Sequence, residues 1–207
     1  MNFTHLHVHT EYSLLDGSNK ITEYVARVKE LGMNSAAITD HGVMFGVIDF
    51  YRAAKSAGIN PILGCEVYVA PGSRFEKNAG ANEDRYYHLV LLAENQKGYE
   101  NLTKIVSKGF VEGYYYKPRV DMELLEEYHE GIIALSACLA GEVQKNLHRG
   151  MYEEAKAAAF RYEKIFGKGN FFLELQDHGM QEQANVNQQL LRLSQDTEIE
   201  LVATNDV

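Results

Sequence analysis

Apolar residues along the chain follow two alternating patterns, short uninterrupted runs and longer stretches with helical spacing. The run at residues 35–39 is typical of a buried strand, whereas Ile21, Tyr24 and Val28 recur on one face of a helix. The same alternation predicts strands at residues 3–10, 35–39, 62–69, 86–93, 131–136, 171–175 and 200–204. It predicts helices at about residues 21–31, 43–57, 97–109, 122–128, 142–148, 152–166 and 183–195.

Strands that alternate with helices indicate a parallel α/β sheet, and continuous apolar strands indicate that both faces of the sheet are covered. Such a sheet is either open or closed into a barrel. A barrel collects its reactive groups from the tips of many strands, whereas an open sheet concentrates its site at one switch point. Polar residues at strand tips are spread along this chain, which favours a distorted seven-stranded (β/α)7 barrel. They are His7, His9, Asp16, His41, Glu66, His88, Cys138, His178 and Asp206.

The first predicted strand carries three histidines, His5, His7 and His9. Side chains alternate sides along an extended strand, so the three imidazoles share one face. Imidazole is the commonest neutral metal ligand, and two such groups on one strand can reach one ion or two neighbouring ions. Ordinary histidines near a chain start are the alternative interpretation. The residues that follow the strand, Thr10 and Glu11, lack the glycines of a dinucleotide-binding turn.

Other candidate ligands lie in apolar surroundings. Glu66 sits within an apolar strand, where an unpaired carboxylate is costly, so we expect it to bind a cation. His88 allows the same argument less strongly, because a buried histidine is often only hydrogen-bonded. Cys138 taken alone is more typical of a small buried apolar residue than of a ligand. His129 and the other histidine on a polar helix surface, His148, are assigned no role.

Composition narrows the class of protein. The chain has 207 residues, enough for one large domain or two small ones, and 45% of them are hydrophobic. Two cysteines, no apolar leader and no long apolar stretch favour a reducing cytoplasm and no membrane partner. The net charge of −9 argues against a broad basic surface for nucleic acid, so DNA binding should be weak unless another domain supplies affinity. A cluster of acids and histidines around cations is compatible with this charge.

Six short motifs stand in order along the chain and together resemble the polymerase and histidinol phosphatase (PHP) family, most of all its members from bacterial replicative DNA polymerases. The resemblance spans nearly the whole chain, and the ordered set is far more specific than any single motif. The motifs are His7-Val8-His9-Thr10, Thr39-Asp40-His41-Gly42, Gly64-Cys65-Glu66, His88, Ala134-Leu135-Ser136-Ala137-Cys138 and Ala203-Thr204-Asn205-Asp206.

The family resemblance implies a site for up to three divalent cations, commonly zinc, manganese or iron. His5, one place outside the first motif, and His178 are then expected to contact a ligand or the substrate and not a cation. Matched position by position, the implied metal ligands are His7, His9, Asp16, His41, Glu66, His88, Cys138 and Asp206.

The resemblance also implies a function, the metal-dependent hydrolysis of phosphoesters and specifically the removal of nucleotides from the 3′ end of DNA. Glu66, His9 and Asp206 would be the catalytic residues. Pyrophosphate and small phosphomonoesters are alternative substrates of the same chemistry. A second hypothesis is structural: the domain braces the polymerase or docks a separate proofreading exonuclease, and the metals mainly stabilise it. The expected partners are DNA, the remaining polymerase domains and the other holoenzyme subunits.

The end of the chain leads to a further expectation. The last motif of the family reads Asp-x-His, and the chain stops at Val207, one residue before the expected histidine. We therefore expect residues 1–207 to be a single PHP domain, with 71–85 as a surface excursion, cut from a larger bacterial polymerase subunit. Loss of that histidine is expected to weaken one cation site and to leave little hydrolytic activity.

Overall fold

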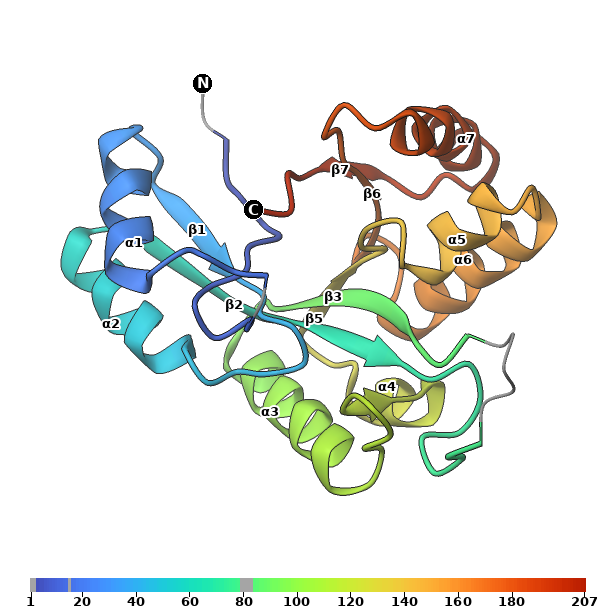
Figure 1. Cartoon of the computed structure of the whole chain (residues 1–207), viewed down its shortest axis with the longest axis horizontal. Helices are drawn as coiled ribbons and strands as arrows, with labels where there is room; N and C mark the ends of the chain where they lie inside the picture. Colours follow the sequence, from blue (N-terminus) through green and yellow to red (C-terminus); the bar gives the residue numbers. More distant parts are fainter. Residues whose placement is uncertain (1–2, 15, 79–83) are drawn as a thin grey trace.

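The computed structural model describes residues 3–14, 16–78 and 84–207 (Figure 1). The predicted helices are confirmed to within about one turn at each end. The helices are α1 (Ile21–Glu30), α2 (Val47–Ala57), α3 (Gln96–Val111), α4 (Met122–Tyr128), α5 (Glu142–His148), α6 (Tyr152–Phe166) and α7 (Gln181–Thr197). The strands are β1 (Ser35–Ile38), β2 (Asn60–Val69), β3 (Tyr87–Ala93), β4 (Arg119–Val120), β5 (Ile132–Leu135), β6 (Phe171–Leu175) and β7 (Leu201–Ala203).

The strands form one curled sheet in the order β1-β2-β3-β5-β6-β7, with the short β4 attached to β2. The predicted barrel class is confirmed, but the prediction of a wholly parallel sheet is wrong for β3. This strand runs antiparallel to both β2 and β5. Val69, at the end of β2, pairs with Tyr87, at the start of β3, so the connection between them joins adjacent strand ends. A parallel pair would instead need a crossover that returns to the opposite end of the sheet.

The N-terminal segment closes the gap between β1 and the end of the chain. Ala37 of β1 donates to the carbonyl of His5 at 3.0 Å, and Thr39 donates to that of Val8 at 2.9 Å. The two donors are two residues apart, whereas the two acceptors are three residues apart. The N-terminal segment therefore carries one extra residue opposite β1, as in a β-bulge. The prediction of a regular strand at residues 3–10 is therefore wrong, although its place in the barrel is right. On the other side, His9 donates to the carbonyl of Val207 at 2.6 Å.

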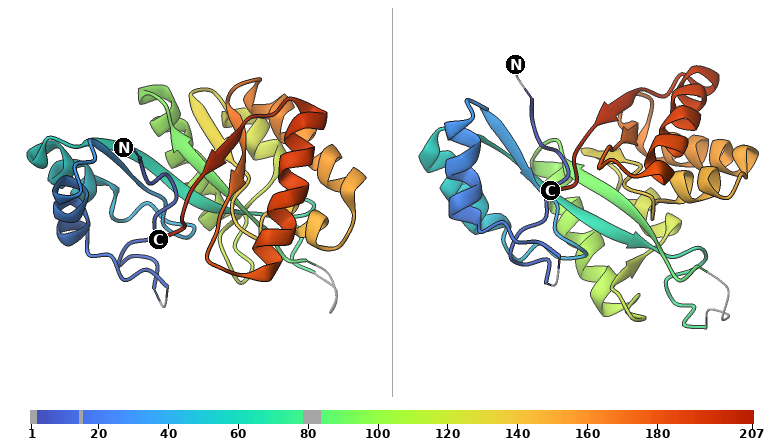
Figure 2. Two further views of the ribbon diagram at one scale, coloured as in Figure 1. Left: turned by 90° about the horizontal axis from the view of Figure 1, so that it is seen from above. Right: turned by 45° about the horizontal axis from the view of Figure 1, so that its top comes forward.

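The helices surround the outside of the curled sheet (Figures 1 and 2). Helices α1 and α2 pack over the N-terminal segment and β1 through a core that includes Val8 and Phe50. Helices α3 to α7 cover the remaining strands through a larger core that includes Leu102 and Tyr162. A third, small cluster around Val90 is formed by inward-facing side chains of β1, β3 and β5. The interior of the sheet is therefore apolar at one end, and the polar groups described below lie at the other.

The segment after β2 leaves the sheet and is held by a buried arginine. Arg74 pairs with Asp121, with Nη1 and Oδ1 2.9 Å apart, and its Nε donates to Glu112 Oε2 at 2.7 Å. Residues 79–83 of the expected excursion at 71–85 lie outside the described residues. The predicted loop at 113–119 ends in β4, whose short ladder to β2 the sequence pattern does not predict.

Candidate metal centre

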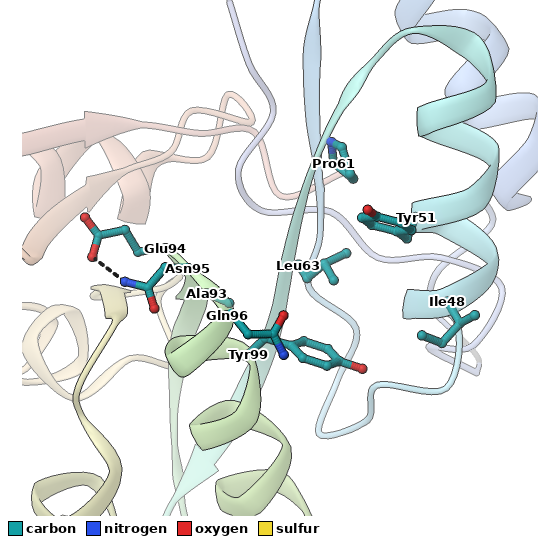
Figure 3. Close-up of a pocket in the computed structure, with 9 residues that line it drawn as sticks. All are labelled: Ile48, Tyr51, Pro61, Leu63, Ala93, Glu94, Asn95, Gln96 and Tyr99. Atoms are coloured by element: carbon teal, nitrogen blue, oxygen red, sulfur yellow. Dashed lines mark hydrogen bonds between the residues drawn. The ribbon is translucent and has the colours of Figure 1, made fainter.

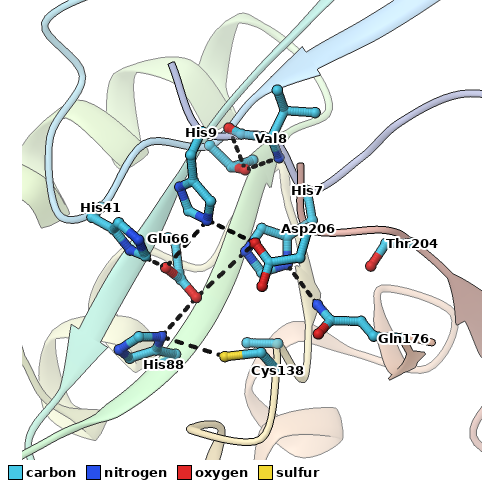
Figure 4. Close-up of polar contacts among 12 residues, drawn as sticks. His7, Val8, His9, His41, Glu66, His88, Cys138, Gln176, Thr204 and Asp206 are labelled. Carbon is cyan, nitrogen blue, oxygen red and sulfur yellow. Dashed lines mark hydrogen bonds and ion pairs between the residues drawn. The ribbon is translucent and has the colours of Figure 1, made fainter. Parts of the chain in front are cut away.

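The predicted ligands meet around Glu66, a fully buried residue in the C-terminal half of β2 (Figure 4). Its Oε1 lies 2.8 Å from Nδ1 of His88 and 3.4 Å from Nε2 of His7. Its Oε2 contacts His41 Nδ1 and lies 3.8 Å from His9 Nε2. Residues from the N-terminal segment, the tip of β1 and strands β2 and β3 thus enclose one carboxylate.

Three overlapping groups of ligand atoms result, in each of which the atoms lie within 4.8 Å of one another. Glu66, His9 and His41 each belong to two groups, so adjacent sites share ligands. This overlap is the arrangement that a cluster of neighbouring cations requires. The groups are His7, His9 and Glu66; His9, Asp16 and His41; and His41, Glu66 and His88.

The buried polar atoms at the centre lack acceptable hydrogen bonds. Among the described residues, none is made by Nε2 of His7 and His9, by Nδ1 of His41, or by either carboxylate oxygen of Glu66. Buried polar atoms are almost always hydrogen-bonded, so a converging set that makes only ion-pair contacts among its own members needs an explanation. Imidazole nitrogens and carboxylate oxygens suit zinc, manganese or iron, and a bound cation would satisfy them together. The residues present therefore fit the cations that the family implies.

Electrostatics keeps the central carboxylate ionised. Burial alone would raise the pKa of Glu66, but its contacts with His41, His7 and His88 hold that pKa well below the usual range. The charged form is the one that binds a cation. Burial likewise opposes protonation of His7, and the carboxylates of Glu174 and Glu66 raise its pKa well above the ordinary value. Protons and cations thus compete for this imidazole.

A second carboxylate fixes the orientation of His7 from behind. Glu174 Oε1 lies 2.7 Å from His7 Nδ1 and also accepts from the hydroxyl of Thr204. Gln176 Nε2 donates to the same oxygen at 3.0 Å. When His7 Nδ1 donates to Glu174, the lone pair of Nε2 faces the centre, as in the carboxylate–histidine pairs of metal sites. The sequence analysis missed Glu174, although an acid within the apolar run of β6 calls for the argument applied to Glu66.

Asp40 organises the loop that carries Asp16. Its carboxylate accepts from the backbone N–H of Thr10 at 2.6 Å, from the hydroxyl of that residue at 2.7 Å and from the hydroxyl of Ser13 at 2.7 Å. The Ser13 oxygen in turn accepts from the N–H of His41 at 3.1 Å. This buried network couples the positions of both loops at the mouth. The sequence analysis assigned Asp40 no separate role, because a strand-end aspartate has no periodic pattern.

The remaining predicted ligands lie around the central groups. Asp206 Oδ1 is 2.9 Å from His9 Nε2 and 3.4 Å from His7 Nε2. Cys138 Sγ is 3.6 Å from His88 Nδ1, and burial raises the pKa of its thiol. Asp16, whose side chain is 61% exposed, contacts Nε2 of His41. The structure thus brings all eight predicted ligands to one mouth, with Cys138 and Asp206 outside the three groups of ligand atoms.

The two histidines that were predicted to contact a ligand or the substrate, His5 and His178, lie apart from these groups. His5 packs its ring edge-on against Phe3, with ring centroids 4.9 Å apart. His178 is exposed, and its Nε2 contacts the carbonyl of Asn205 while its Nδ1 lies 2.9 Å from Gln183 Nε2. Both ring nitrogens of His178 are therefore engaged within the chain.

Two surface pockets differ in their relation to the centre. A cavity of about 150 Å³ opens directly beside it and is lined by His9, Asp16, Asn19 and Asp206 among others. A larger groove of about 310 Å³ is lined by residues of α2 and α3, among them Tyr51 and Tyr99 (Figure 3). No predicted ligand lines this groove. Of these two pockets, it is the smaller cavity that opens onto predicted ligands.

A curled α/β barrel with a histidine- and carboxylate-lined mouth defines a class of metal-binding domain. The chain belongs to the PHP domain family, whose model matches residues 5–178. It is 48% identical to DNA polymerase III subunit alpha of Treponema pallidum over 207 residues, which are 100% of this chain and 18% of that protein. It is 45% identical over 204 residues to the protein of the same name from Borreliella burgdorferi, covering 99% of this chain and 18% of that one.

The fold is shared with a solved structure of low sequence identity. A Bifidobacterium adolescentis protein assigned as a metal-dependent phosphoesterase superposes with a TM-score of 0.63 at 16% identity, covering 99% of this chain and 87% of that one. The chain spans less than a fifth of the length of the two polymerase relatives it matches. In the part of the chain that the structure describes, every helix is too short or too polar to span a bilayer.

Proposed function

We propose that this domain is a metal-dependent phosphoesterase that removes nucleotides from the 3′ end of DNA. The observation that supports the proposal best is the set of buried histidine nitrogens and carboxylate oxygens at the centre, which make no acceptable hydrogen bonds and offer three overlapping ligand groups beside an open cavity. Similarity to DNA polymerase subunits favours DNA over small phosphoesters as the substrate.

The roles of the residues follow from their positions. Glu66 belongs to two ligand groups and links them, because each of its oxygens faces one imidazole from either group. Divalent cations, when bound, supply positive charge to the phosphate and make a water more acidic. His9 and Asp206 line the open cavity, where they would orient the phosphate and hold a proton during hydrolysis. Up to three such cations, of zinc, manganese or iron, are proposed.

An exonuclease assay tests the proposal. Purified protein is incubated with manganese or zinc and a single DNA strand labelled at its 3′ end, beside the variants Glu66→Gln and His129→Ala. Glu66→Gln keeps the size of the side chain and removes its charge, so it should abolish cleavage. His129 is exposed at the end of α4, and its ring nitrogen Nδ1 contacts the Glu126 carbonyl, so it should be replaceable without loss. Absence of cleavage by the metal-loaded wild type, also when a histidine is added two residues after Asp206 to complete the last motif of the family, would refute the exonuclease activity.

A structural role is the second candidate function. His7 and His9 lie in the N-terminal segment, and Asp206 lies in the C-terminal segment. Backbone hydrogen bonds between these two segments close the barrel, which favours a structural role. Cations held there would brace that closure and, through it, the polymerase or a docked proofreading exonuclease. Chelation separates the two functions. A large fall in the melting temperature favours bracing, whereas lost cleavage at an unchanged melting temperature favours catalysis.

The comparisons also support a proposal about context. We propose that residues 1–207 form the PHP domain of a bacterial DNA polymerase III alpha subunit that acts in the cytoplasm. Its partners would be the DNA 3′ end, the other domains of that subunit and the other subunits of the holoenzyme. The net charge of −9 predicts that the isolated domain binds DNA weakly at physiological salt.

A further inference from the structure

A lysine lies one aromatic ring away from the metal centre. Lys117 belongs to the loop between α3 and β4, and its Nζ is 5.3 Å from the centre of the Tyr68 ring. Tyr68 follows Glu66 by two residues on β2, so both side chains lie on the same face of the strand. The Tyr68 ring centre is 6.3 Å from that of His41 and 5.2 Å from that of His88. The Tyr68 ring thus lies between the ammonium group and two of the predicted ligands in this chain of contacts.

The backbone of this loop is locked in an unusual conformation. Tyr116, directly before Lys117, has a φ of 61°, which a bulky residue rarely adopts. The N–H of Tyr115 donates to the carbonyl of Lys117 at 3.0 Å, and Arg119 Nε fixes the base of the loop by donating to the Gly113 carbonyl at 3.2 Å. Conformations of this kind persist only where the surroundings impose them, and they concentrate at functional sites. The loop therefore places Lys117 in a defined position.

Lys117 makes no ion pair with a carboxylate in the described part of the chain. Lys108 pairs with Glu112 at 3.0 Å and Lys145 pairs with Asp84 at 2.6 Å, whereas no described carboxylate lies within 4.0 Å of Lys117 Nζ. The neighbouring mouth is rich in acids, and a phosphate that approaches it meets repulsion. An ammonium group at the rim offsets that repulsion and can donate several hydrogen bonds to phosphate oxygens.

From this placement we infer that Lys117 is a substrate-binding residue that holds a phosphate group of a nucleotide at the rim of the metal centre. The inference rests on the proposed function and deepens it. It assigns the recognition of phosphate to a side chain of the protein in addition to the cations. The tyrosine ring beneath the ammonium group fixes its position through a cation–π contact.

A binding experiment tests Lys117 separately from hydrolysis. Manganese-loaded wild-type protein and the variant Lys117→Ala are titrated with thymidine 5′-monophosphate in low salt by calorimetry. Loss of one charged hydrogen-bond donor should weaken binding about tenfold, and added salt should reduce this difference. Lys117→Arg keeps a cation and should retain most of the affinity. Metal content and melting temperature should stay at the wild-type values.

Lys104→Ala is the matched control, because Lys104 Nζ lies in a similar position 5.4 Å from the Tyr128 ring centre, on the outer surface of α3. It should leave binding unchanged. The inference is wrong if Lys117→Ala binds the nucleotide as tightly as the wild type, or if it loses its metal as well, which would indicate a packing role. Nucleotide binding that depends on Lys117 without DNA cleavage by any variant would refute the exonuclease proposal and leave this inference intact.

Discussion

Glu174 provides a direct test of how the metal centre is held in place. In the wild type, Glu174 Oε1 lies 2.7 Å from His7 Nδ1. The substitution Glu174→Gln keeps the shape of the side chain and leaves one oxygen that can accept from this nitrogen. It removes the charge that makes this hydrogen bond strong. Because Glu174 lies behind His7 and outside the groups of ligand atoms, the substitution changes the orientation of a ligand without deleting one.

The size of the effect follows from the contacts of Glu174. A hydrogen bond to a charged group is roughly twice as strong as a neutral one, and loss of such partners in metal sites typically lowers affinity by about 10–100-fold. We expect Glu174→Gln to lie near the lower limit, since one acceptor remains. Glu174→Ala also leaves the Thr204 hydroxyl and the Gln176 amide without their acceptor, which should destabilise the fold by about 1–3 kcal/mol.

Competition with a chelator of known affinity measures the zinc dissociation constant of each variant, and urea unfolding measures stability. Glu142→Gln is the control. Glu142 is a partly buried acid whose carboxylate accepts from Arg161 and Tyr162, both on helix α6 and neither a predicted ligand. It should lose stability without losing zinc affinity. If Glu174→Gln binds zinc within about twofold of the wild type, the carboxylate does not position His7 and our account of this contact fails.

Two further predictions concern stability. Burial opposes ionisation of Asp84, but Arg149 and Lys145 lower its pKa from 3.8 to about 2, so its stabilising effect is present above about pH 4 and is lost as the pH falls towards 2. Asp84→Asn should therefore cost about 1 kcal/mol in urea unfolding at pH 7 and almost nothing at pH 2, and an equal cost at both would contradict this. Asp40→Asn replaces one acceptor oxygen by a donor and leaves a loop hydroxyl or N–H unpaired, which should cost about 1–3 kcal/mol. Unchanged unfolding of this variant would show that the loop does not depend on Asp40.

The sequence predicted the helices and the meeting of the ligands because both depend on local patterns. Helical periodicity records which face of each helix is buried, and apolar runs that end in polar residues mark strand tips. The direction of β3 could not be predicted in this way. An apolar run such as that of residues 86–93 looks the same whether its neighbours are parallel or antiparallel. The difference is revealed by the pairing of the strands, for example of Val69 with Tyr87.

The irregular closure of the barrel also could not be predicted from the pattern of residues in the sequence. Residues 3–10 alternate as a strand would, but the extra residue opposite β1 depends on which carbonyls reach Ala37 and Thr39. The same holds for Glu174, whose importance comes from its contact with His7, 167 positions away in the chain. Long-range contacts of this kind do not produce a periodic pattern in the sequence.

The metal content of the purified protein tests the central claim most directly. Elemental analysis of the wild type and of Glu66→Gln, each dialysed against trace zinc and manganese, gives the number of cations per chain. Our account predicts up to three cations in the wild type, one for each ligand group, and a clear loss in Glu66→Gln, because Glu66 belongs to two of those groups. Equal metal content in both proteins, or none in the wild type, would contradict it.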